Sequence, residues 1–271
     1  MLVLLFHINK FNNFDTNMKK YIILPVLAAM LATSCSQTDD PGLDPEKPLN
    51  LTVSLDASKP QFQSGSRADD EMWHTGDSLT LSFDTGAWGV VVYDAVAKLW
   101  SGIVNGTLKQ DERSTVTVGY FGKPEILDGI AQIGSFTASY IDAGGSYLYN
   151  SADAHLYLNA SLQPTTGRIR FKGDPNREIN VGGLTCNSSF NVSQGGFIYS
   201  TDEIPLTVAA DGYTPYVYCT FTDLESLSIY VRDSSGKYSI NFAENTLTSG
   251  RSGTLTLPTP DNYLGWDFSE N

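Results

Sequence analysis

Apolar and polar residues alternate with a period of two along most of this 271-residue chain. The alternation is typical of strands with one buried and one solvated face, because successive side chains of a strand point to opposite faces. Turn residues interrupt it about every ten positions, and helical periodicity is scarce. The alternating segments are residues 49–55, 78–83, 88–93, 115–121, 136–141, 154–158, 168–171, 178–181, 215–221, 227–231, 238–242 and 253–257. The sequence therefore predicts an all-β protein built of antiparallel sheets.

Breaks in the pattern divide these strands into two groups. The Ser-Ser-Gly sequence at 234–236 separates two alternating segments and predicts a hairpin. Stronger breaks occur at 142–146 and 163–167, and we place a domain boundary at the second. The expected architecture is two antiparallel β-sandwich domains in series, residues 49–163 and residues 164–271.

The N-terminal residues predict a secretion signal that begins at Met18 rather than at Met1. Lys19 and Lys20 form a basic start, an apolar run follows over residues 21–32, and small residues precede Cys35. The apolar run is about a dozen residues long, whereas a helix needs roughly 20 to cross the hydrocarbon core. We therefore expect residues 1–34 to be a leader that is removed, with residues 1–17 an extension upstream of the true start.

The leader ends in Leu-Ala-Thr-Ser-Cys at 31–35, which resembles a lipobox, where the cysteine becomes the lipid-bearing first residue of the mature protein. Ala32 stands where Leu is usual, and an ordinary signal followed by an incidental cysteine is the alternative. Several acyl chains on Cys35 would give lasting membrane attachment. The acidic stretch at 36–40 resembles the tag that sends lipoproteins of Bacteroidales-type bacteria to the outer face of the outer membrane. The resemblance implies a lipid-anchored surface protein. The stretch after Cys35 is rich in Asp, Pro, Gly and Gln, so we expect residues 35–48 to form its lipidated tether.

The mature chain is strongly acidic. Removing residues 1–34 takes away three of 17 basic and one of 30 acidic residues, which leaves a formal net charge of −15. Such a surface repels phosphate backbones, and the chain has no basic cluster, so we expect no nucleic-acid partner.

Two cysteines remain after Cys35, namely Cys186 and Cys219. In an exported protein they can form a disulfide, or both can be core residues of separate strands. Their spacing and neighbours do not match a metal site. The acidic run at 69–71 lacks the alternating oxygen ligands of a calcium loop. We therefore expect no metal and no cofactor.

Recognisable catalytic motifs are absent from the sequence. His74 and His155 are the only histidines after the leader, and neither belongs to a local motif with a nucleophile. No Gly-x-Ser-x-Gly, His-Glu-x-x-His or phosphate loop occurs. Paired carboxylates of a glycoside hydrolase stay open as an alternative, although most acidic residues lie in turns or at strand ends. We expect a protein that is not an enzyme.

Four tryptophans and 14 tyrosines raise the alternative of an aromatic platform for sugar. Sandwich cores also use aromatic side chains, and we assign Trp73 and Trp100 to the core. Trp88 lies between small residues in Gly-Ala-Trp-Gly at 86–89, so it is the first candidate for ligand binding. The alternative function is therefore a carbohydrate-binding outer-surface lipoprotein of a glycan-uptake system.

Several motifs follow one another in a fixed order over residues 48–268. After the first alternating segment come Arg67-Ala68, Trp-His-Thr-Gly-Asp at 73–77, Trp100, Phe-x-Ala-x-Tyr at 136–140, Ser-Gly-Arg-Ser-Gly at 249–253 and Gly265-Trp266. Together with the lipobox, this order resembles the fimbrillin family, the subunits of lipoprotein-derived pili of Bacteroidales-type bacteria. The resemblance implies a transthyretin-like topology in each sandwich and a role in fimbriae and cell adhesion.

In that family an Arg-specific protease cuts at the Arg-Ala site, which releases the lipid together with the first strand. A strand from a neighbouring subunit then fills the groove. Mapped here, Arg67 and Ala68 form the cleavage site and residues 49–55 the removed strand. The alternative is that Arg67 lies in a polar loop that is never cut.

The resemblance leaves several roles open. The chain is shorter than a typical shaft subunit, and little follows Gly265-Trp266 that could serve as a donor arm. A shaft, tip or anchor subunit, or a surface lipoprotein that shares only the fold, all fit. The expected partners are other fimbrial subunits or copies of the chain itself, the outer membrane, and host or bacterial surface ligands.

Overall fold

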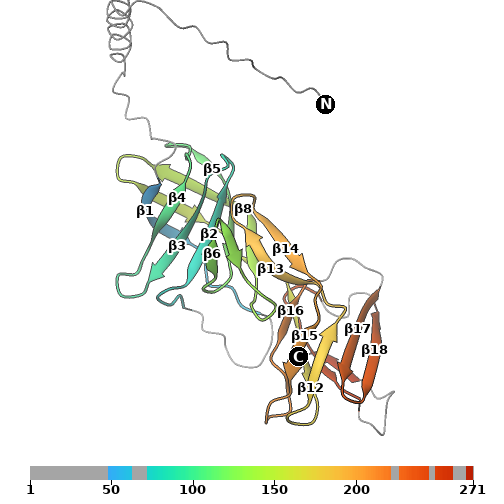
Figure 1. The fold of residues 1–271 in the computed structure, drawn as a ribbon. Helices are drawn as coiled ribbons and strands as arrows, with labels where there is room; N and C mark the ends of the chain where they lie inside the picture. Colours follow the sequence, from blue (N-terminus) through green and yellow to red (C-terminus); the bar gives the residue numbers. More distant parts are fainter. Residues whose placement is uncertain (1–47, 63–71, 221–225, 244–247, 259–266, 271) are drawn as a thin grey trace, which may run out of the picture. The chain divides into compact units, whose positions relative to one another are not determined.

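The computed structural model describes residues 48–62, 72–220, 226–243, 248–258 and 267–270. The regular structure of these residues is β-strand throughout, and twenty strands form four sheets (Figure 1). The prediction of an all-β protein is therefore confirmed. Within the described ranges no helix is long and apolar enough to span a membrane. The predictions for Cys35, Arg67 and Ala68 fall outside the described residues.

The largest sheet closes on itself. In sheet order its eight strands are β10 (Gln163–Pro164), β8 (Tyr140–Asn150), β5 (Arg113–Tyr120), β2 (Ser78–Phe83), β3 (Trp88–Asp94), β4 (Leu99–Asn105), β1 (Leu49–Asp56) and β9 (His155–Asn159). β9 also pairs antiparallel with β8, which joins seven of these strands into a ring. Closure gives each strand of the ring a hydrogen-bonded neighbour on both sides and leaves no free edge.

Three further sheets have four strands each. Their strands, in sheet order, are β14 (Gly196–Ser200), β13 (Cys186–Asn191), β7 (Ile130–Gln132) and β6 (Glu125–Leu127); β16 (Val217–Cys219), β11 (Gly167–Lys172), β19 (Ser252–Thr256) and β20 (Asp267–Glu270); and β15 (Ile204–Thr207), β12 (Glu178–Gly182), β17 (Ser226–Asp233) and β18 (Gly236–Ala243). The first of them takes strands from both sides of the predicted boundary at 163–167. The arrangement is thus one closed sheet and three smaller sheets, where the sequence predicted two pairs of facing sheets. The limits of the two domains stay a prediction.

The apolar side chains that alternate along the strands are buried in more than one hydrophobic core. The ring strands bury apolar side chains, among them Leu51, Val53, Leu79, Leu81, Val91, Trp100, Val104, Val118, Tyr147 and Leu156. A second cluster gathers buried residues of the later strands, among them Ile169, Phe171, Val181, Cys186, Val217, Cys219, Ile229 and Leu255. A smaller cluster consists of Phe121, Ala131, Ile133, Phe190 and Val192. Burial of this apolar surface is the main stabilising contribution to the fold.

Two local predictions have opposite outcomes. The hairpin at 234–236 is confirmed, because β17 and β18 pair along their length and end with Asp233 opposite Gly236. The strand expected at 136–141 is wrong for residues 136–139. Gly134 has a φ of +76° and its carbonyl accepts the Thr137 N–H at 3.3 Å, so a turn replaces the strand. Phe136, the first apolar residue of this alternating segment, is 53 % exposed.

Candidate functional site at the first strand

β1 lies inside the closed sheet although it comes from the start of the described chain. It pairs antiparallel with β4 over residues 49–53 and parallel with β9 over residues 52–56. Leu51 and Val53 point inward and are 4 % and 1 % exposed, while Thr52 between them is exposed. β4 and β9 are therefore joined through β1, and the ring would be open between them without it.

The segment after β1 is fixed to the Trp-x-x-Gly-Asp turn that the sequence singled out. Lys59 Nζ lies 3.0 Å from Asp77 Oδ2, and both side chains are largely buried. Asp77 Oδ2 also accepts the backbone N–H of His74 at 2.8 Å. The indole N–H of Trp73 donates to the Ala57 carbonyl at 3.5 Å. The turn thus has a physical role, since it holds the chain that leaves β1.

Aromatic rings support this turn from the inside of the sheet. The Trp73 ring packs edge-on against Trp100 and Tyr120, with centroids 5.0 and 5.1 Å apart. Trp100 is 4 % exposed, which confirms its assignment to the core. The Tyr120 hydroxyl donates to Asp77 Oδ1 at 3.3 Å. Burial, and then the Asp77 carboxylate, raise the pKa of Tyr120, so its hydroxyl remains a donor.

Phe62 is a second attachment point for the same segment. Its side chain is 6 % exposed and packs edge-on against Tyr140 and Tyr218, with centroids 5.8 and 5.5 Å apart. The guanidinium carbon of Arg168 lies 4.9 Å from the Phe62 centroid and 4.3 Å from that of Tyr216. Such cation–π contacts are strongest where both groups are desolvated, and Arg168 is buried. Phe62 is thus held by residues of β8, β11 and β16.

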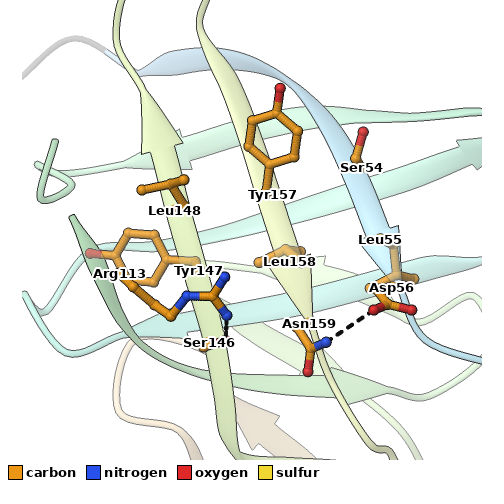
Figure 2. A pocket seen from close by; sticks show the side chains of 10 residues that line it. All are labelled: Ser54, Leu55, Asp56, Arg113, Ser146, Tyr147, Leu148, Tyr157, Leu158 and Asn159. Atoms are coloured by element: carbon orange, nitrogen blue, oxygen red, sulfur yellow. Dashed lines mark hydrogen bonds between the residues drawn. The ribbon is translucent and has the colours of Figure 1, made fainter. Parts of the chain in front are cut away.

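A pocket of about 470 Å³ opens beside β1 (Figure 2). It is lined by Ser54, Leu55, Asp56, Arg113, Ser146, Tyr147, Leu148, Tyr157, Leu158 and Asn159. The side chain of Asn159 donates to Asp56 Oδ2 at 3.1 Å, and Arg113 Nη1 donates to Ser146 Oγ at 3.4 Å. Because β1 supplies residues 54–56, the pocket has this lining only while β1 is in place.

Trp88, the sequence candidate for ligand binding, is partly buried. Its ring packs against the small cluster that contains Phe121 and Phe190. Part of the indole faces Gly129, where an added Cβ would come within 3.4 Å of it. Trp88 does not line the pocket beside β1. Ligand binding by Trp88 stays a prediction.

Cys186 and Cys219 are free thiols in the second core, 2 % and 1 % exposed. Thr185 and Thr220 form an antiparallel bridge, so the next pair along this pairing is Cys186 opposite Cys219. Burial raises the pKa of both thiols, and at Cys219 the neighbouring Cys186 raises it further. Among the described residues no group of His, Cys, Asp and Glu side chains is arranged to hold a metal ion.

Sequence reasoning missed the two attachment residues Lys59 and Phe62. Phe62 is an isolated aromatic residue in a polar stretch that runs from Ser58 to Ser66, and such a residue is a signal that could have been used. Nothing in the sequence marks Lys59 as an attachment residue. Its partner Asp77 lies in a turn, and the alternation of apolar and polar residues predicts strands but not contacts with turns. The pocket also combines residues of four strands, β1, β5, β8 and β9, and β1 is distant from the other three in the sequence.

Comparison with known proteins gives only distant similarities to solved structures. No family model matches the chain, and no curated protein matches it. A solved structure described as a candidate cell adhesion protein of Bacteroides ovatus is 14 % identical, with 83 % of this chain and 96 % of that chain covered and a TM-score of 0.46. A fimbrial assembly protein of Parabacteroides distasonis is 11 % identical over 83 % and 100 % of the two chains, with a TM-score of 0.39. A candidate adhesin of Bacteroides ovatus is 12 % identical over 80 % and 91 %, with a TM-score of 0.41.

Proposed function

We propose that this chain is a fimbrillin-like surface subunit that joins or caps a fibre by exchanging β1 for a strand of a neighbouring subunit. The position of β1 carries the proposal. It is the first of the described strands, yet it is hydrogen-bonded on both sides within a closed sheet. Its role in this proposal is structural and adhesive rather than catalytic.

Loss of β1 would leave a site that favours another strand. β4 and β9 would each present unpaired backbone N–H and C=O groups, which are costly to leave without partners. The position of Val53 would become a gap in the core beside its cross-strand neighbours Trp100 and Leu156. The position of Leu51, opposite Gly102, would become a second gap. An incoming strand with apolar residues at alternate positions would restore both the hydrogen bonds and the packing.

The attachments of Lys59 and Phe62 explain why the uncut subunit would stay closed. The Lys59–Asp77 ion pair and the Phe62 contacts both lie between β1 and Arg67. A cut at Arg67 frees the segment from the rest of the chain, so that it can dissociate together with β1 and the lipid on Cys35. A subunit that is not cut would keep its lipid and serve as an anchor at the cell surface.

Treatment of the purified protein with an Arg-specific protease tests the exchange. We expect a cut after Arg67 followed by a ladder of oligomers that withstands detergent, because interlocked strands dissociate slowly. The matched control is Arg67→Lys, which keeps the charge but removes the cleavage site. We expect this variant to remain a monomer under the same treatment. A wild-type protein that is cut after Arg67 and still runs only as a monomer would falsify strand exchange.

A further inference from the structure

The pocket beside β1 presents an exposed aromatic ring. Tyr157 of β9 lies opposite Leu148 of β8 and beside Ser54 of β1. It is 46 % exposed, and the His155 ring packs against it with centroids 4.5 Å apart. His155 Nε2 in turn shares a hydrogen bond of 2.9 Å with Ser54 Oγ. The ring is thus held from one side, and the other parts of its surface are available to a ligand with an apolar face.

A row of polar groups lies next to this ring. Asn159 is opposite Ser146 of β8 and beside Asp56 of β1, and Arg113 of β5 reaches Ser146 (Figure 2). Asn159 donates one N–H to Asp56, and Arg113 donates one of its five N–H groups to Ser146. The amide oxygen of Asn159, the second carboxylate oxygen of Asp56 and other guanidinium N–H groups provide further hydrogen-bonding capacity. The row can therefore both donate to a ligand and accept from it.

The charges of the lining residues favour a neutral ligand. Arg113 and Asp56 come from β5 and β1, with β8 and β9 between them, so the two sides of the pocket carry opposite charges. An ion of either sign would be attracted by one side and repelled by the other. A polyhydroxyl ligand can accept hydrogen bonds from Arg113 and donate to Asp56 at the same time. The volume of about 470 Å³ lies in the range of small-ligand pockets.

We propose that this pocket binds a neutral sugar unit, a hexose or N-acetylhexosamine, which packs its C–H face on Tyr157 and hydrogen-bonds to Arg113, Asn159 and Asp56. The site needs a strand in the β1 position, because residues 54–56 form one wall. It does not need strand exchange. A subunit that keeps β1 would present the complete site, whereas a subunit that has exchanged β1 would lack Ser54, Leu55 and Asp56.

An array of neutral hexose and N-acetylhexosamine oligosaccharides tests the proposal on the full chain, with sialylated and sulfated glycans alongside. We expect binding to at least one neutral glycan. Titration with that glycan should show Tyr157→Ala and Asn159→Ala each weakening the affinity at least tenfold. Tyr157→Phe should retain most of the affinity, since it keeps the ring. The matched control is Tyr199→Ala on β14, another exposed tyrosine at 56 %, which should bind as the wild type does.

Three results would overturn the sugar site. They are an array with no neutral glycan bound, a preference for the charged glycans, and equal loss of binding in the Tyr157→Ala and Tyr199→Ala variants. Circular dichroism of each variant separates loss of binding from loss of folding. Failure of the protease experiment would leave the sugar site standing, and an empty array would leave strand exchange standing, so the two proposals can fail separately.

Discussion

The carboxylate of Asp233 stabilises the hairpin between β17 and β18 by accepting several hydrogen bonds. Its Oδ1 accepts hydrogen bonds from the Ser235 N–H at 2.8 Å and the Gly236 N–H at 3.1 Å, and Arg177 Nε donates to its Oδ2 at 2.9 Å. Burial alone would raise the pKa of Asp233, but the hydrogen bonds from Ser235 and the Arg177 guanidinium outweigh it, so the pKa is lowered. A lowered pKa contributes stability above the unfolded-state pKa of about 3.9, and this contribution is lost as the pH falls through the folded-state pKa.

Replacing Asp233 with Asn should therefore destabilise the protein most at neutral pH. The amide cannot compensate the charge of the partly buried Arg177 guanidinium, and we expect the free energy of unfolding to drop by about 2 kcal/mol at pH 7. The difference from the wild type should shrink as the pH falls below about 4, where the carboxylate becomes protonated in the unfolded state, and further as the pH falls through the lowered folded-state pKa. Urea unfolding at pH 7 and pH 3 measures both effects. Asp211→Asn, at an exposed turn carboxylate, is the control and should behave as the wild type does. An equal difference at both pH values would contradict this account.

The opposed positions of Cys186 and Cys219 favour a disulfide in an oxidising medium. The antiparallel bridge at Thr185 and Thr220 places Cys186 opposite Cys219. Opposed residues of an antiparallel pair have Cα atoms about 4.5–5.5 Å apart, and a disulfide can span this separation. Burial raises the pKa of both thiols and lowers the thiolate fraction, so we expect oxidation to be slow in the folded protein. Refolding with oxidised glutathione, which takes up the two electrons, should yield a product two hydrogens lighter. Two thiols that still react with iodoacetamide after such refolding and denaturation would rule the bridge out; Cys186→Ser is the control.

At the scale of elements, β1 contributes to stability through alternate residues. Val53 is 1 % exposed, and Val53→Ala should lower the free energy of unfolding by about 2 kcal/mol through lost burial and a residual cavity. The adjacent Thr52 faces solvent, and Thr52→Ala should cost less than about 0.5 kcal/mol. Chemical denaturation of the two variants measures the difference. Equal effects at both positions would mean that β1 is not held as a core strand in solution.

How much of the fold could be predicted depended on how strictly each strand alternates. β1 and β2 alternate and were found, whereas β4 was missed because Gly102 interrupts its pattern. A Cβ at Gly102 would lie 2.0 Å from the Val90 carbonyl oxygen, so close packing of β3 and β4 requires a residue without a side chain. β13 was missed for another reason, since it buries the polar residues Asn187 and Ser189 where the pattern expects apolar ones. Both β4 and β13 form because of packing against neighbouring strands, and the periodicity of the sequence carries no information about that packing.

The candidate site was predicted in part for a related reason. The sequence indicated a first strand at 49–55 and a turn at 73–77, and both were found. Their connection through the Lys59–Asp77 ion pair could not be predicted, because it crosses a turn that periodicity does not describe. The parallel pairing of β1 with β9 could not be predicted either, because it joins residues about 100 positions apart. Ring closure is a non-local event that local patterns leave undetermined. Phe62 differs, because an aromatic residue alone in a polar stretch indicates from the sequence that its side chain is buried in a contact.

At the scale of the whole molecule, the first strand and the segment after it connect parts of the fold that are far apart in sequence. β1 completes the ring between β4 and β9, and Lys59 holds the chain at Asp77. Phe62 then reaches Arg168 and Tyr218, which belong to a different sheet. Removing this segment would therefore open the ring and leave a vacant aromatic site at the same time. A replacement that fills both positions should bind more tightly than one that fills only the ring.

A synthetic peptide of residues 49–62 tests this expectation between molecules. Added to protein that has been cut after Arg67, it should occupy the vacated position and suppress the detergent-resistant ladder in proportion to its concentration, because it restores both the strand and the Phe62 contacts. A peptide carrying Phe62→Ala should need at least a tenfold higher concentration, which corresponds to about 1.4 kcal/mol of lost binding. A scrambled peptide of the same composition is the control and should leave the ladder unchanged. If the scrambled peptide suppresses the ladder as well as the native one does, or if neither has an effect, the subunits join at a surface other than the β1 position.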